Sequence, residues 1–238
     1  MPQPEFDLRL DGFDAADART EEAFGHAIGS SLGELTPLAQ HHSEDGTHSY
    51  YVLHDGSVTW GIPGSPQLVA LHLQRDLQAR TYSFLHAVMP LPVMAQSWLV
   101  RRGCPQDAIG LVPGLSAAAD EATRTLEQQL LSNGRDFVPM DSYTHDAEPM
   151  STLVVLRARD PRNPVPYRVL HEELNSKTWT HTLREGGFAT AEEAFEWYAD
   201  CLGGEAGPLP PVTVTAPTTR PAKSAAPSVA PRTVRRSR

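Results

Sequence analysis

The sequence has few of the residues that would tie it to a disulfide framework or a membrane. Among 238 residues only two are cysteine, Cys104 and Cys201, and two thiols so far apart in sequence make no such framework. No stretch approaches the roughly 18 apolar residues of a membrane helix. The N-terminus has neither the basic region nor the apolar region of a secretion signal. We therefore expect a cytoplasmic protein that does not associate with membranes.

Familiar catalytic motifs are also missing. The sequence contains no G-x-S-x-G, no G-x-G-x-x-G and no P-loop. His171 begins like the zinc motif H-E-x-x-H, but Asn175 stands where the second histidine belongs. The best remaining cluster is the stretch DSYTHDAE, whose acids and histidine could do acid–base work or bind a cation: Asp141, His145, Asp146 and Glu148. A merely polar loop explains it as well, so we expect no cofactor and favour a protein that is not an enzyme.

Histidine is concentrated in one stretch, HHSEDGTHSYYVLHDGS, which begins at His41. A structural zinc site needs four ligands at a recognised spacing, usually with cysteine, and no cysteine lies within this stretch. Asp55-Gly56 between two apolar runs is a strong hairpin signal. We therefore predict a polar loop followed by a β-hairpin over residues 49–62, and no metal site.

Local patterns predict an α+β protein. The N-terminal region should be an α/β region with the hairpin and several helices, followed by a three-stranded sheet plus a helix and then a disordered tail. We expect strands over residues 6–10, 151–160, 166–175 and 178–187, and helices capped or begun at Thr20, Ser65-Pro66, Val93, Ala117 and Thr190. Thr190 with Glu193 three residues later is a capping box. These patterns divide the chain into domains at 1–134, 135–202 and 203–238.

Two segments of the chain are similar to each other. Tyr50–His54 and Tyr167–His171 share the pattern Tyr-x-Val-Leu-His, and each is followed by a turn and a tryptophan, Trp60 or Trp179. Two related units in one chain, or the common composition of strands, would both explain this match.

The third region also resembles a known DNA-binding arrangement. Three strands, a Gly186-Gly187-Phe188 link and a helix with Trp197 are similar to the small arm-type DNA-binding domain of phage tyrosine integrases. That family needs a basic excess on the face that enters the groove. Residues 150–202 hold six basic and eight acidic side chains, so the chain departs from the family at this point and is not assigned to it.

Charge is unevenly distributed. The net charge is −9, but all six basic residues after position 211 lie in a stretch without acids, which leaves 14 basic and 29 acidic residues before it. The acidic body should repel nucleic acid, while the Pro/Ala/Thr/Ser-rich tail could attract it. The arginines that we expect to contribute to binding are Arg157, Arg159 and Arg168 on the strands, and Arg232, Arg235, Arg236 and Arg238 in the tail.

These observations favour one function over two alternatives. We expect a non-catalytic regulatory protein that binds another protein, as an accessory factor of a DNA-processing system of the phage or plasmid type. The first alternative is a nucleic-acid-binding protein that uses the tail and the strand arginines. The second is a metal-dependent hydrolase that uses residues 141–148. The sequence does not define an oligomeric state.

Overall fold

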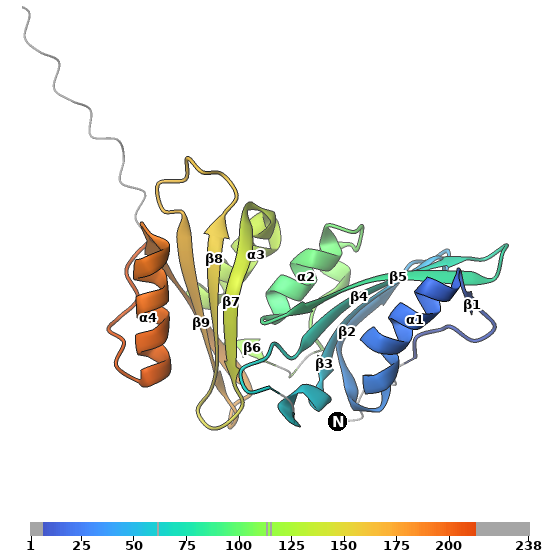
Figure 1. Ribbon diagram of the computed structural model, residues 1–238, viewed down its shortest axis with the longest axis horizontal. Helices are drawn as coiled ribbons and strands as arrows, with labels where there is room; N and C mark the ends of the chain where they lie inside the picture. The colour runs from blue at the N-terminus through green and yellow to red at the C-terminus, as the bar shows by residue number, and fades with distance from the viewer. Residues whose placement is uncertain (1–6, 61, 113, 115, 213–238) are drawn as a thin grey trace, which may run out of the picture.

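The chain folds into two similar halves (Figure 1), seen here in a computed structural model that describes residues 7–60, 62–112, 114 and 116–212. The first half contains, in order, β1 (Asp14–Ala15), α1 (Ala18–Ala27), β2 (Leu35–His42), β3 (His48–Asp55), β4 (Leu68–Asp76), β5 (Thr81–Met89) and α2 (Pro92–Val100). The second half contains β6 (Ala117–Ala118), α3 (Glu121–Asn133), β7 (Phe137–His145), β8 (Met150–Ala158), β9 (Tyr167–Asn175), β10 (Thr180–Phe188) and α4 (Ala191–Gly203). Short 3₁₀ helices cover Gly29–Glu34, Gly56–Trp60, Gln106–Ala108 and Gly134–Asp136.

Each half builds its sheet in the same way. The strand orders are β1-β5-β4-β3-β2 and β6-β10-β9-β8-β7. In both sheets the two-residue first strand runs parallel to the last strand, and all other neighbours are antiparallel. In both, the first long strand shifts register directly after a proline, Pro37 in β2 and Pro139 in β7. The α+β class predicted from the sequence is confirmed, with two five-stranded sheets and four α-helices in the described part of the chain.

Equivalent hairpins confirm how the halves correspond. In the turn from β4 to β5, the Asp76 carboxylate accepts two backbone N–H bonds and Arg80 has a φ of 57°. In the turn from β9 to β10, Asn175 accepts two such bonds and Trp179 has a φ of 51°. The sequence match noted above therefore paired strands that do not correspond, because Tyr50–His54 lies on β3 and Tyr167–His171 lies on β9.

The elements stack in layers along the longest axis of the molecule (Figure 1). The order is α1, the first sheet, the adjoining helices α2 and α3, the second sheet and α4. One cluster of buried residues joins the halves, since it contains Leu91 and Val93 at the start of α2 together with Leu126 and Leu130 of α3 and four residues of the second sheet. Within the described residues, no helix is long and apolar enough to cross a membrane.

Several local predictions were wrong. The hairpin expected over 49–62 is replaced by β2 paired with β3, and Asp55-Gly56 leads out of β3 into a 3₁₀ helix. The helix expected from Ser65-Pro66 is the β4–β5 hairpin. Residues 7–10 form no strand, and α1 is capped by Asp17 rather than by Thr20.

The second sheet also differs from the prediction. It has five strands instead of three, because β7 replaces the expected polar loop and β6 joins from residues 117–118. Helix α2 and the capping box of Thr190 and Glu193 are confirmed, and α3 is confirmed except for its start, which lies at Glu121 after an Asp120 cap and not at Ala117. Part of the expected tail also packs on the body, since Leu209 and Val212 lie against Gly186 and Gly187 of β10. Residues 213–238, with the four tail arginines, lie outside the described residues.

Candidate functional site

The two halves differ in chemistry at one set of equivalent positions that are buried or half-buried. In the first half, Phe24 of α1 packs edge-to-face on Tyr82 of β5 with ring centroids 5.3 Å apart, and Leu73 of β4 belongs to the same cluster. In the second half the equivalent positions hold Glu127, His181 and Glu172. An apolar cluster is sufficient to stabilise this fold, so an ionisable cluster at the same positions is a candidate for function.

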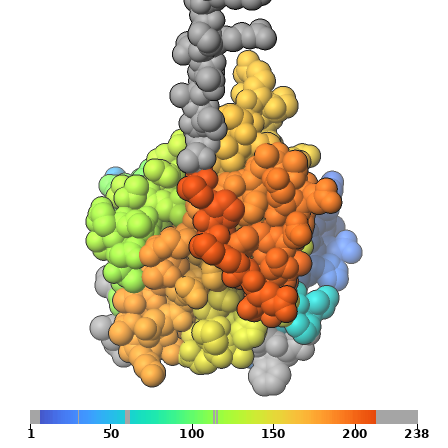
Figure 2. Space-filling model, turned by 90° about the vertical axis from the view of Figure 1, so that its left-hand side faces the viewer, coloured from blue at the N-terminus to red at the C-terminus, as the bar shows by residue number. Residues whose placement is uncertain are grey.

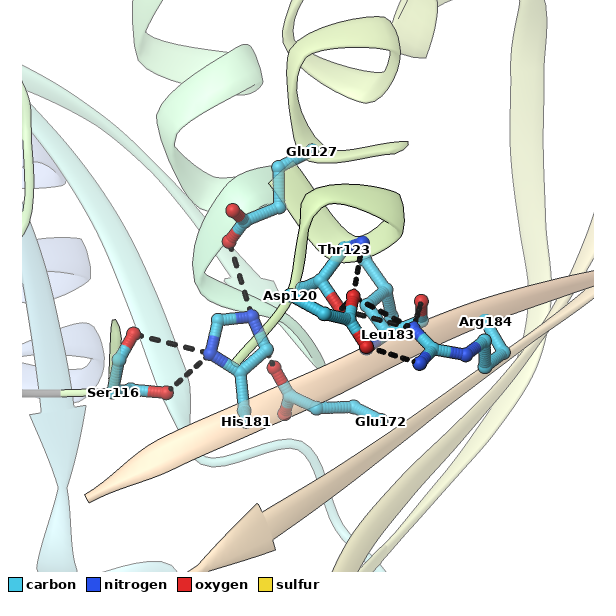
Figure 3. A network of polar contacts seen from close by, with 8 residues as sticks. All are labelled: Ser116, Asp120, Thr123, Glu127, Glu172, His181, Leu183 and Arg184. Atoms are coloured by element: carbon cyan, nitrogen blue, oxygen red, sulfur yellow. Dashed lines mark hydrogen bonds and ion pairs between the residues drawn. The ribbon is translucent and has the colours of Figure 1, made fainter. Parts of the chain in front are cut away.

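Figure 3 shows how the ionisable cluster is arranged around His181, which is 3% exposed. Its Nε2 lies 3.1 Å from a Glu127 carboxylate oxygen and 4.0 Å from one of Glu172. Its Nδ1 lies 3.1 Å from the carbonyl oxygen of Ser116 and 2.9 Å from the hydroxyl oxygen of that residue. A carbonyl oxygen can only accept, so Nδ1 carries a proton and the ring becomes a cation when Nε2 is protonated too.

Burial and charge shift both acid–base groups toward neutral pH. Burial raises the pKa of Glu172 to about 7, the charge of His181 lowers it and that of Glu127 raises it. Burial lowers the pKa of His181, but the hydrogen bond to Glu127 and the charges of both glutamates outweigh burial, so the net shift is upward. The cluster therefore changes its charge close to physiological pH.

Glu172 and Ser116 also line a cavity of about 440 Å³ that lies between the halves. Its lining is mostly apolar and comes from both sides, with Leu38 and Leu68 from the first half and Leu174 from the second. The hydroxyl of Thr144, which also lines it, is buried without a hydrogen-bond partner. The cavity has the size of a small-ligand site and a few convergent polar groups.

The polar stretch predicted as a candidate catalytic cluster is divided by the structure. His145 and Asp146 line the cavity between the halves, and the Asp146 carboxylate accepts a hydrogen bond from Gln67 of the first half. Asp141 lies on β7 near α4. Burial, and after it the charge of Asp141, raises the pKa of Tyr198 on α4 to about 12. Glu148 is exposed in the turn before β8 and does not line this cavity.

The three strand arginines also lie in different places. Arg157 and Arg159 are exposed at the end of β8. Arg168 is 8% exposed, pairs with Glu185 at 3.1 Å and lies over the ring of Phe137 on the α3 side of the sheet. The structure therefore brings Arg157 and Arg159 together and leaves Arg168 in an internal ion pair.

Histidine side chains of the stretch that begins at His41 contact side chains on neighbouring strands. His48 and His72 lie 3.0 Å apart between ring nitrogens, and Tyr50 stacks on His72 with ring centroids 4.4 Å apart. The Nδ1 of His42 lies 2.7 Å from the hydroxyl of Ser49. No group of three or more His, Cys, Asp or Glu side chains within residues 7–60, 62–112, 114 and 116–212 is placed to hold a metal ion.

A second difference between the halves concerns the outer edge of each sheet. In the second half, β10 bonds to β6 at its start, and near its end Gly187 N–H donates to the Pro210 carbonyl at 3.1 Å. Figure 2 shows the segment that follows α4, residues 204–212, coloured red and lying on the surface of the second half. In the first half, β5 bonds to the segment around β1 only at its start, through Arg80 and Tyr82.

The chain after α2 explains why β5 is left open. This segment crosses to the opposite edge of the first sheet, where Val112 N–H donates to the Leu38 carbonyl of β2 at 2.8 Å, and then enters the second half. Among the described residues, no segment is paired with the outer edge of β5 beyond Tyr82. Leu85 and Val88 on this strand are 49% and 54% exposed.

Comparison of this chain with protein-family models, with curated proteins and with solved structures finds no match.

Sequence reasoning missed the cluster of Glu127, Glu172 and His181 and the open edge of β5. A usable signal for the cluster was present, because Leu71-His72 and Leu170-His171 are equivalent and are followed by Leu73 and Glu172. The match between Tyr50–His54 and Tyr167–His171 concealed it by aligning β3 with β9.

Proposed function

We propose that the protein binds another polypeptide by adding an extended segment of that partner to the open edge of β5. The observation that supports this most directly is the contrast between two equivalent edges. Residues 207–212 of the chain itself bond to and pack on the end of β10, whereas the equivalent end of β5 has no such cover in the described residues.

The backbone of β5 has the geometry that strand addition needs. The carbonyls of Arg80 and Tyr82 point outward to the segment around β1. Hydrogen-bonding groups alternate along a strand, so those of Phe84, His86 and Val88 also point outward. An exposed strand edge with unpaired groups and apolar side chains is a template for another strand, and natural proteins usually cover or charge such edges.

The surroundings of β5 indicate what kind of segment fits. Leu85 and Val88 offer apolar contacts on opposite faces of the strand. The beginning of the chain and α1 are acidic, with eleven acids and two basic residues in positions 1–60, and the charge of Glu21, after burial, raises the pKa of Tyr82 at the start of the edge. We therefore infer an extended partner segment with apolar residues and a basic residue. Residues 207–212, Gly-Pro-Leu-Pro-Pro-Val, are the apolar template within the chain.

The test uses Val88→Pro. Proline removes the outward N–H of residue 88 and blocks a neighbouring strand, and it leaves the inner hydrogen bonds to β4 in place. Peptides selected from a displayed random decapeptide library on the wild-type protein are titrated by fluorescence polarisation. We expect the Kd for Val88→Pro to rise about tenfold, the loss of one or two net hydrogen bonds.

Val88→Thr is the matched control, because threonine has a similar shape and keeps the N–H. It should lose far less affinity than Val88→Pro, and both variants should keep the wild-type circular dichroism spectrum. Bound peptide should also slow amide hydrogen exchange in residues 84–88. Equal binding by Val88→Pro, or protection that appears only elsewhere in the chain, would show that the proposed edge is not the binding surface.

A further inference from the structure

Four arginine side chains line one recess between the two halves, separate from the cavity at Glu172. The recess has a volume of about 450 Å³. Its arginines come from the end of α2 and from one end of the antiparallel β7–β8 pair, where β7 begins and β8 ends: Arg101, Arg102, Arg135 and Arg159. Its remaining lining includes Trp98, Met94, Phe137 and Leu156. The recess therefore combines positive charge with an apolar and aromatic surface, called its floor below, which includes Trp98, Met94 and Phe137.

The positive charge of the recess has little compensation. No carboxylate of the described residues lines it. Asp136 beside it approaches Arg135 at 3.7 Å, and Arg135 is 77% exposed at this rim. The side chains of Arg101 and Arg159 have no ion pair within the described residues. In a chain with a net charge of −9, four arginines in one recess with a single carboxylate near its rim require an explanation.

The arginines also destabilise each other. Burial first, and then the charge of Arg159, lowers the pKa of Arg101. Burial first, and then the charge of Arg101, lowers the pKa of Arg102. A bound anion would remove this repulsion, and a fold that retains the repulsion without an anion loses stability.

The side chain of Arg102 is held in a fixed orientation at the recess. The guanidinium of Arg102 lies 3.3 Å from the centre of the Trp98 ring and donates to the Trp98 carbonyl at 2.9 Å. Its Nε is buried and has no hydrogen-bond partner. A buried donor without a partner costs free energy, and a ligand oxygen would satisfy it. The stacked, oriented guanidinium also loses less side-chain freedom on binding than a free one would.

We propose that this recess binds a small phosphate monoester whose organic part is apolar or aromatic. A phosphate monoester carries close to two negative charges at neutral pH and has several acceptor oxygens, which matches several arginine forks better than a single carboxylate does. The floor of Trp98, Met94 and Phe137 would contact the organic part. A volume of about 450 Å³ suits a ligand of that size, and a recess of this kind does not admit a nucleic-acid duplex.

The experiment measures binding of 1-naphthyl phosphate to the full chain by isothermal titration calorimetry. The double variant Arg101→Gln with Arg159→Gln, called the cleft variant below, removes from the recess two charges that have no ion pair. The control is Arg19→Gln with Arg124→Gln, which removes two charges on α1 and α3 that do not line the recess. We expect one site, a Kd about tenfold or more higher in the cleft variant, and a Kd in the control close to that of the wild type.

Three further ligands make the outcome decisive. We expect 1-naphthoate, inorganic phosphate and a short single-stranded oligonucleotide to bind at least about tenfold more weakly than 1-naphthyl phosphate. Equal affinity for naphthoate would overturn the phosphate assignment, and equal affinity for inorganic phosphate would overturn the role of the floor. An oligonucleotide that binds more tightly and is lost in the cleft variant would assign the arginines to nucleic acid instead. Unchanged binding in the cleft variant, with its melting temperature preserved, would remove the site.

Discussion

At the scale of single residues, the cluster around His181 differs in kind from its apolar equivalent. The polar cluster holds two carboxylates and one imidazole, with side-chain exposed fractions of 27% for Glu127, 16% for Glu172 and 4% for His181. Removing such charges from water is costly, and a hydrophobic cluster of similar volume is often at least as stable. The first half shows this apolar solution with Phe24 and Tyr82. The polar cluster therefore makes the stability of the second half depend on pH.

The sign of that dependence follows from the two pKa shifts. In the unfolded chain Glu172 has the ordinary carboxyl pKa of 4.5, and in the folded chain its pKa is about 7. Between these values the folded state keeps a proton that the unfolded state has lost, so the free energy of unfolding falls as pH rises through this range. The raised pKa of His181 acts in the same direction, because its stabilising contribution is present below 6.5 and is lost as pH rises through the folded value. The pKa values of His42 and His72, which burial lowers to about 4, act in the opposite direction below pH 6.5, so the contribution of Glu172 is the difference in urea unfolding between the wild type and a variant without this carboxyl.

Glu172→Gln should gain stability relative to the wild type as pH rises from 4.5 to 8, because the amide keeps the shape of the side chain and cannot ionise. The matched control is Glu173→Gln, the exposed neighbour on the same strand, which should retain the wild-type slope. If the stability curves of Glu172→Gln and the wild type stay parallel between pH 4.5 and 8, Glu172 does not titrate in this range.

At the scale of elements, α1 and α3 begin with the same cap but are anchored differently. Asp17 accepts a hydrogen bond from Thr20 N–H at 2.7 Å, and Asp120 accepts one from Thr123 N–H at 2.8 Å. Asp120 also pairs with Arg184 of β10, and the hydrogen bonds from Arg184 and Thr123 hold the pKa of Asp120 well below its usual range. In the second half the cap of α3 therefore also connects this helix to β10.

The matched substitutions Asp120→Ala and Asp17→Ala separate these two roles. Both should lower the melting temperature at pH 7, because both remove a cap. Asp120→Ala should lower it more, since it also leaves Arg184 without its partner, and added salt should reduce the difference. The lowered pKa of Asp120 stabilises the fold above the usual carboxyl pKa, so this contribution should disappear as pH falls through the folded value. Equal decreases at pH 7 would show that the pairing with Arg184 adds nothing.

At the scale of the whole molecule, the second half is completed by the segment that follows α4. The side chain of Trp197 donates to the Gly207 carbonyl at 3.1 Å, and Leu209 packs against the cluster that α4 forms with β8, β9 and β10. Gly186 and Gly187 leave room for this segment, because an added Cβ would come within 2.6 Å of Leu209 and 3.2 Å of Val212. The segment thus protects an edge that would otherwise resemble the open edge of β5.

Two truncated chains measure the contribution of this segment. A chain ending at Val212 keeps it, and a chain ending at Gly203 lacks it. We expect the shorter chain to have a free energy of unfolding lower by about 1–3 kcal/mol, from the loss of the half-buried side chains of Leu209 and Val212 and of the hydrogen bonds that residues 204–212 make with the body. Exposure of Trp197 should also shift its fluorescence to longer wavelength. Identical denaturation curves for the two chains would contradict the packing of residues 204–212.

Elements with local signals could be predicted from the sequence. The capping box at Thr190, the glycine after Asn133 and the strand-like runs of residues 151–187, separated by proline-rich and polar turns, each depend on neighbouring positions, and α3, α4 and β8 to β10 follow from them. The α+β class follows from the same signals.

The remaining elements and both residue clusters depend on contacts between positions far apart in the sequence. β4 is buried on both faces between α1 and α2, so its apolar run has no alternation and was taken for a helix. The Asp55-Gly56 signal was overridden because the chain leaves the sheet there. Glu127, Glu172 and His181 are up to 54 residues apart in sequence, and Arg101 and Arg159 lie 58 apart, so only the packing of α2 and α3 between two sheets brings each group together.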